Sequence, residues 1–66
     1  MKLVIVLDAD NAAFEDYGIG PEVARILRWL AERMATARNA DDIRYEPVVL
    51  KDINGNIVGT CKTVES

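Results

Sequence analysis

Only one stretch of this 66-residue sequence, residues 21–38, has both the length and the apolar pattern of a stable helix. On a helical wheel its apolar residues share one face, formed by Val23, Leu27, Leu30, Met34 and Ala37 with Ile26 and Ala31 on the flanks. An apolar face this wide belongs to a helix that packs on a sheet or on another helix. The remainder of the chain must therefore supply the surface that covers it.

Three predicted strands can form that surface. Residues 2–7 (KLVIVL) are a continuous aliphatic run, typical of a strand that is buried on both faces. Residues 43–50 and 56–63 are the other two strands, and the DINGN turn between them is a strong hairpin signal. Pro47 cannot donate to a ladder, so it indicates an edge strand or a bulge. Residues 1–66 are therefore predicted to be one α+β domain, a two-layer β-α-β-β fold with one helix packed on a three-stranded sheet.

The pairing of the first strand stays open at this point. It can lie parallel to the second strand, or it can lie beside the third strand in a wholly antiparallel sheet. In either case we expect the core to combine Val4 and Val6, or Leu3 and Ile5, with Ile26, Leu27, Leu30, Met34, Val48 and Leu50.

The size of the chain favours self-association. A domain this small buries only about 60% of the surface that its unfolded chain exposes. The single Cys61 excludes an internal disulfide, and the absence of histidine excludes a zinc site of cysteine and histidine. One helix also leaves the other face of residues 2–7 uncovered, and monomers rarely keep such an apolar patch. We therefore expect a homo-oligomer, in the simplest case a homodimer formed sheet against sheet or edge to edge, with Trp29 at its rim.

Charge and composition narrow the class of partner. The net charge of −3 and the pI of about 4.7 argue against unaided binding to nucleic acid or to an anionic membrane. The sequence contains no secretory core and no apolar run of the roughly 20 residues that a membrane span needs. Together with the lone cysteine, these features predict a cytoplasmic protein.

An acidic stretch, residues 8–20, separates the first strand from the helix. It carries four acidic residues and no basic one, and we expect a loop with one helical turn near residues 11–15. Connections of this length are often functional. We therefore expect it to form the binding surface, with the residues Asp8, Asp10, Phe14, Glu15, Asp16 and Tyr17.

Trp29 is a second candidate binding residue. It lies at the margin of the helix's apolar face, beside Arg25, Arg28 and Arg33. Tryptophan and arginine are the residues enriched at the energetic centres of protein interfaces. The alternative is that the indole ring folds over the sheet edge and extends a small core.

Asp8 and Asp10 carry the alternative hypothesis of an enzyme. Two carboxylates at the end of a strand can share a magnesium ion, as in phosphoryl-transfer enzymes. This strand resembles the opening motif of haloacid-dehalogenase-type phosphatases and the first strand of NYN/PIN-type nucleases. Those families need further acidic residues on later parallel strands, which this chain lacks. We therefore prefer a solvated corner, and predict no catalytic residue, no bound metal and no cofactor.

Three stretches together resemble a family of short uncharacterised phage and prophage proteins. They are DNAAFED (residues 10–16), EVARILRWLAERM (residues 22–34) and LKDINGNIVGT (residues 50–60). The resemblance implies a phage or prophage origin and no assigned activity. We therefore expect a small non-enzymatic interaction protein that binds a host macromolecule or a small ligand, and inhibition of a bacterial defence system is one function that such a protein could have.

Overall fold

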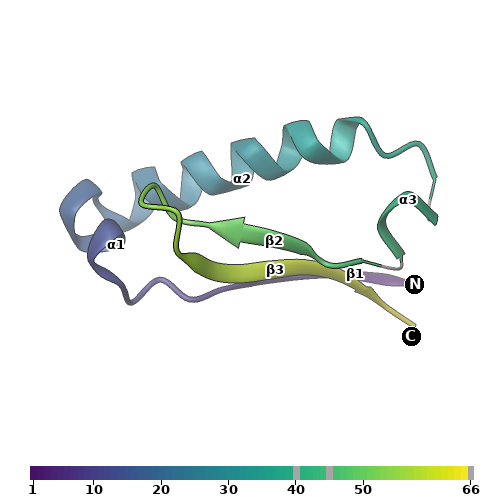
Figure 1. Cartoon of the computed structure of the whole chain (residues 1–66), viewed down its shortest axis with the longest axis horizontal. Helices are drawn as coiled ribbons and strands as arrows, with labels where there is room; N and C mark the ends of the chain where they lie inside the picture. The colour runs from purple at the N-terminus through teal and green to yellow at the C-terminus, as the bar shows by residue number, and fades with distance from the viewer. Residues whose placement is uncertain (40, 45, 66) are drawn as a thin grey trace.

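The computed structural model describes residues 1–39, 41–44 and 46–65, and Figure 1 shows the chain. The elements in chain order are β1 (Lys2–Leu7), α1 (Ala12–Tyr17), α2 (Ile19–Ala35), α3 (Asp41–Arg44), β2 (Val48–Lys51) and β3 (Ile57–Val64). The α+β class and the order of one long helix and three strands are confirmed. The helical turn expected near residues 11–15 is a short helix, α1, and a second short helix, α3, is added to the expected pattern.

The strands form one wholly antiparallel sheet in the order β1-β3-β2. Of the two pairings left open by the sequence, the first strand therefore takes its place beside the third. Cys61 on the central strand β3 lies opposite Ile5 of β1 and Val48 of β2. Gly59 allows β1 to approach, because a Cβ at this position would collide with the carbonyl oxygen of Val6.

Helix α2 runs along one face of the sheet (Figure 1) and comes closer to β2 than to β1. Ile26 and Leu30 are buried against the strands, as predicted, together with Val48 and Leu50, and Met34 is partly buried. The expected burial of Leu27 is wrong, since its side chain is 42% exposed. The helix is turned so that Glu22, four residues before Ile26, faces the sheet, and Leu27 lies about 100° away from that line.

The helical turn expected near residues 11–15 is confirmed and extends to Tyr17 as α1, whereas the loop expected over the rest of residues 8–20 is wrong at its end, because α2 already begins at Ile19. Asn11 caps α1, because its Oδ1 accepts the amide N–H of Ala13 at 3.1 Å. The helix brings Phe14 into the core beside Ile26 and Leu30, where it is only 2% exposed. Phe14 is therefore a core residue and is removed from the candidate binding surface.

The strand expected over residues 43–50 is also shorter than predicted. Residues 41–44 form α3, and Asn39 Oδ1 accepts the Asp41 amide N–H at 3.0 Å. The strand begins at Val48, directly after Pro47. Tyr45, within the expected strand, lies outside the described residues. Local side-chain-to-backbone hydrogen bonds near α3 take the place of strand pairing over the first residues of the expected strand.

The prediction that residues 2–7 are buried on both faces is wrong within a single chain. Leu3, Ile5 and Val6 are 47%, 44% and 55% exposed, and Val4 is only partly buried. Two features of position explain this. Leu3 and Ile5 share the face of Cys61, but β1 is an edge strand and α2 lies toward the opposite edge of the sheet. Val6 points to the other face of the sheet, which α2 does not cover.

The solvent-accessible area of the molecule is larger than expected for a folded monomer of its mass. Its accessible area is 4700 Å², whereas a folded monomer of 7.3 kDa exposes about 4,200 Å². Its radius of gyration is 12.5 Å, compared with about 11 Å for a compact domain of this length. The excess fits the exposed apolar side chains of β1.

The rotation of α2 is tested by a matched pair of substitutions. Leu30→Ala should reduce the free energy of unfolding by about 2–5 kcal/mol, because Leu30 is buried between helix and sheet. Leu27→Ala should change it by about 0.5 kcal/mol or less at low micromolar concentration. Denaturant unfolding followed by circular dichroism measures both, and equal losses would show the helix to be rotated otherwise.

Candidate functional site

The β2–β3 turn is built around the carboxylate of Asp52. Asp52 Oδ1 accepts the backbone amides of Asn54 and Asn56, each at 2.9 Å, and Gly55 takes the positive φ of +85° that the turn requires. The Asp52 amide in turn donates to the carbonyl of Asn56 at 2.9 Å. The hairpin turn predicted from the sequence is confirmed, and its residues are hydrogen-bonded to one another.

The same carboxylate joins this turn to the first helix. Asp52 is 4% exposed, and its Oδ2 accepts the side-chain amides of Asn11 at 2.6 Å and Asn56 at 3.1 Å. Asn11 thus caps α1 with one side-chain atom and holds the turn with the other. Every oxygen of this buried carboxylate is therefore hydrogen-bonded, which is the condition under which such burial is tolerated.

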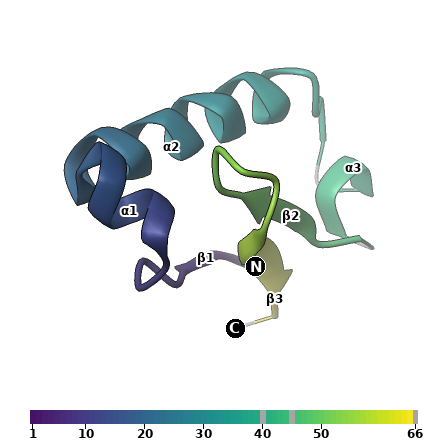
Figure 2. The ribbon, with the colours of Figure 1, turned by 60° about the vertical axis from the view of Figure 1, so that its left-hand side comes forward.

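Glu22 joins the turn to α2. Glu22 is 2% exposed, and its carboxylate accepts hydrogen bonds from Arg25 Nε at 2.7 Å, Arg25 Nη2 at 3.3 Å and the amide of Ile53 at 2.9 Å. Arg25 Nη2 also donates to the carbonyl of Lys51 at 3.0 Å. Figures 1 and 2 both show the turn reaching up to α2, where these bonds form.

The hydrogen bonds set the protonation of both acids. The bond from Arg25 lowers the pKa of Glu22, burial opposes this, and the Ile53 amide lowers it further, so the pKa lies below its ordinary value. Burial acts to raise the pKa of Asp52, but the bonds from Asn56, Asn11 and Asn54 outweigh it and the pKa is again lowered. Both groups are therefore carboxylates at neutral pH.

A groove of about 640 Å³ lies beside this polar network, between α2 and β2. Its lining comes from α2 (Arg25, Trp29, Arg33), from β2 and the residue before it (Pro47, Val48, Val49, Lys51), and from the turn (Asp52, Ile53, Gly55). We call this surface the Trp29 groove. Trp29 is 49% exposed, so its ring is available at the surface rather than sealed in the core.

The Trp29 groove has an excess of positive charge. The guanidinium of Arg25 is paired with Glu22, but within the described ranges neither Arg33 nor Lys51 has a carboxylate within 4.0 Å. Asp52, also in the lining, directs its carboxylate into the turn. An aromatic ring flanked by two free cations is suited to bind a ligand that carries an apolar group beside an acidic one, with the apolar group on the ring and the acidic group on the cations.

The acidic candidates lie elsewhere and do not converge on Trp29. Asp8 and Asp10 are exposed and line a separate depression of about 270 Å³ with Asn11, Ile57 and Val58. Asp8 Oδ1 accepts the Asp10 amide at 3.2 Å. In the part of the chain that the structure describes, no three acidic or cysteine side chains form a group that could hold a metal ion.

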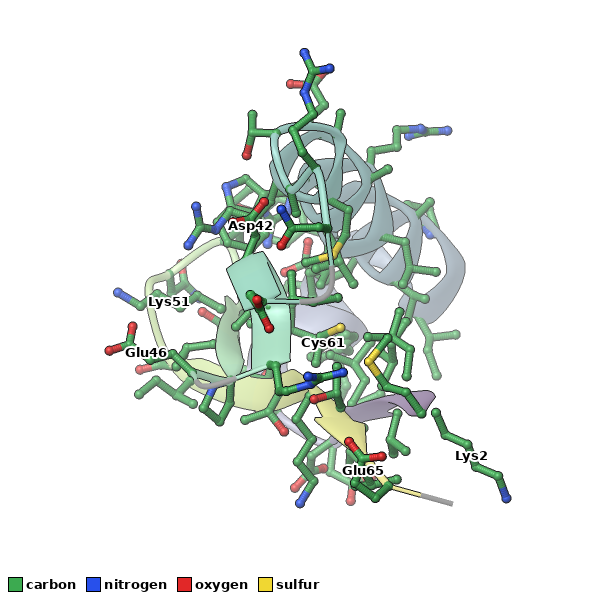
Figure 3. All side chains as sticks on the ribbon, turned by 90° about the vertical axis from the view of Figure 1, so that its right-hand side faces the viewer. Lys2, Asp42, Glu46, Lys51, Cys61 and Glu65 are labelled. Carbon is green, nitrogen blue, oxygen red and sulfur yellow. The ribbon has the colours of Figure 1, made fainter. Side chains whose placement is uncertain are left out.

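The other acidic-stretch candidates divide between surface and core. Glu15, Asp16 and Tyr17 are exposed on α1, whereas Phe14 on the same helix is buried. Cys61 is buried in the core between α2 and the sheet (Figure 3), and burial raises the pKa of its thiol. A thiol in this position is a packing group and is poorly suited to act as a nucleophile.

Sequence reasoning missed Lys51 and Asp52 as parts of the site and Glu22 as a buried group. Arg25 and Arg33 were noted only as neighbours of Trp29. The spacing of Glu22 and Arg25, three residues apart on one helix, was a usable signal for an ion pair. Nothing in the local pattern indicates that β2 would bring Lys51 to the same groove.

Comparison of the chain with protein-family models, with curated proteins and with solved structures found no match. None of the described helices has the length and the apolar character needed to span a membrane.

The buried carboxylates predict an acid-sensitive fold. The pKa values of Glu22 and Asp52 are lower in the folded chain than in the unfolded chain, where they are about 4. The two carboxylates therefore stabilise the fold fully at pH values above the unfolded pKa values, and this stabilisation is lost as the pH falls through the folded pKa values. Glu22→Gln should melt at a lower temperature than wild type at neutral pH, and should lose less on acidification. Thermal melts between neutral pH and about pH 3 measure this.

Glu32→Gln is the control, because Glu32 lies exposed on the same helix. It should keep the wild-type pH dependence. Parallel pH curves for wild type and Glu22→Gln would contradict the role given to the Glu22 carboxylate.

Proposed function

We propose that this chain is a small non-enzymatic interaction protein that binds an acidic segment of a partner protein in the Trp29 groove. The observation that carries the proposal is the placement of Arg33 and Lys51, both without ion-pair partners among the described residues, around the exposed ring of Trp29. A partner with one apolar side chain between carboxylates would complement both features.

The resemblance to phage and prophage proteins is the basis for placing that partner in the bacterial host and the action in its cytoplasm. Inhibition of a defence system is one function within this proposal. The three stretches that carry the resemblance each contribute to the polar network, through Asn11, through Glu22 and Arg25, and through Asp52. The polar network gives these residues a structural role in supporting the groove, which needs no catalytic role.

The position of the acidic groups supports a binding function over a catalytic one. Among the described residues, Asp52 is the one acid lining the groove, and its two oxygens accept four hydrogen bonds, three from the turn and one from Asn11. It is thereby occupied as a structural acceptor, whereas a general base needs a free oxygen within reach of a substrate proton.

Groove binding is tested by titrating the protein with a short glutamate-rich peptide that has a central leucine. Trp29 is the only tryptophan of the chain, so its fluorescence reports on the groove directly. We expect a saturable change that weakens with added salt, and a roughly tenfold weaker affinity for Arg33→Glu, equivalent to about 1.4 kcal/mol.

Arg28→Glu is the matched control, because it makes the same charge change on an exposed arginine that does not line the groove. Its affinity should stay near wild type. Equal weakening by both variants would indicate attraction by net charge alone, and would contradict a site at the groove.

The second candidate is a metal-dependent phosphoryl-transfer or nuclease-like enzyme. It is favoured by one observation, that Asp8 and Asp10 are both exposed and line the same depression beside Asn11. Under our preferred function, magnesium or manganese added to the protein should produce no saturable shift of the Asp8 and Asp10 amide resonances. Saturable binding that disappears in Asp8→Asn would favour the enzyme instead.

We also propose that the chain self-associates, as its size and its exposed apolar strand favour.

A further inference from the structure

We propose that a second copy of this chain pairs with the open edge of β1, about a two-fold axis at Ile5, so that two three-stranded sheets join into one of six. This inference rests on the self-association proposed above, and it is independent of the Trp29 groove. It assigns the surface, the orientation and the register of the pairing.

The two edge strands of the sheet, β1 and β2, differ in how well each could pair with a strand of another chain. β2 has four residues, follows Pro47, and has its Lys51 carbonyl occupied by Arg25. Proline, short length and covering side chains are the features that protect an edge from pairing. β1 has six residues, contains no proline, and has one charged side chain, Lys2, at its first position. The open edge of β1 is therefore the one suited to a second strand.

The backbone of β1 determines which residues would bond to the second copy. The Asp8 amide donates to the Val58 carbonyl of β3 at 2.7 Å, one residue beyond the paired Leu7 and Gly59. Residues bonded to one neighbour alternate along an antiparallel strand. The even-numbered residues thus bond to β3, and Leu3, Ile5 and Leu7 direct their N–H and C=O groups to the open edge.

A two-fold axis at Ile5 satisfies these outward groups. Ile5 pairs with Ile5 of the second copy, and Leu3 pairs with Leu7 of the second copy, all as hydrogen-bonded pairs. Because the contact is the same on both copies, it closes after two chains and leaves no open β1 edge for a third.

The same register brings opposite charges together. It places Lys2 of each copy directly opposite Asp8 of the other, and both side chains lie on one face of the sheet because both positions are even. Lys2 is exposed, and Figure 3 shows it on the opposite side of the molecule from Lys51. A shift of the register by two residues would lose both pairs, so charge as well as backbone favours the axis at Ile5.

Apolar surface on the neighbouring flank of α2 extends the interface. Arg25, Trp29 and Arg33 line the groove over β2, so Leu27, about 100° further round the helix from Ile26, lies on the β1 side. The exposed side chains of Leu3 and Ile5 are on the sheet below this flank. A second copy would cover apolar groups that one chain leaves in water, consistent with the excess accessible area of the monomer.

Sedimentation velocity over a wide concentration range tests the pairing. The wild-type chain should reach twice its 7.3 kDa mass with rising concentration. Ile5→Lys places two like charges at the axis and should weaken the dimer by about a hundredfold or more. Val49→Lys is the control, because Val49 is an exposed apolar residue of β2, at the edge of the sheet opposite β1, and it should leave the dimer intact.

Charge exchange tests the register independently of any effect on folding. Lys2→Glu alone and Asp8→Lys alone should each weaken the dimer roughly tenfold, since like charges then face each other twice. The double variant should regain wild-type affinity. Lys51→Glu, with the same charge change on the distant strand β2, should have no effect.

Three results would overturn the inference in distinguishable ways. A single species of 7.3 kDa at all concentrations would reject self-association itself. A dimer that Val49→Lys disrupts and Ile5→Lys does not would reject the β1 edge and favour face-to-face packing of the sheets. A double variant that stays as weak as the single ones would reject the register. Saturable peptide binding at Trp29 is unaffected by each of these results.

Discussion

The structure depends on two buried carboxylates whose acceptor positions are filled. Glu22 and Asp52 sit where α1, α2 and the β2–β3 turn meet, and each joins a helix to the turn. Because the apolar core is small, we infer that this junction supplies the additional stabilisation that a disulfide or a metal provides in other small domains. A neutral isostere at either position would leave donors such as the Ile53 amide facing a weaker acceptor.

The same junction prepares the surface on which the proposed function depends. Glu22 orients Arg25, and Arg25 holds the Lys51 carbonyl, so one end of the Trp29 groove is braced by hydrogen bonds from both of its walls. Of the side chains that this network leaves free in the groove, Arg33 and Trp29 project from helix α2 and Lys51 projects from strand β2, and none of the three lies on a loop. Binding groups on a rigid element lose less conformational entropy when a partner arrives.

The parts of this fold that follow from local chemistry were predictable from the sequence. The DINGN turn and the burial of Ile26 and Leu30 depend on residues close in the chain. The errors arose where a distant segment decides the outcome. Glu22 is buried because the turn supplies a donor, and the exposure of β1 depends on which edge α2 covers. Lys51 and Trp29 line the same groove only because β2 is the strand nearest to α2. Predicting this needs the order of the strands in the sheet, which the sequence left open.

The position of Cys61 gives the protein an internal reporter of its own opening motions. Its thiol lies in the core on the central strand, 2% exposed and with a raised pKa. A thiol reagent can reach it only when α2 and the sheet separate, so the rate of modification follows the population of opened molecules. Because the chain has no other cysteine, that rate measures one defined event, the transient separation of the two layers.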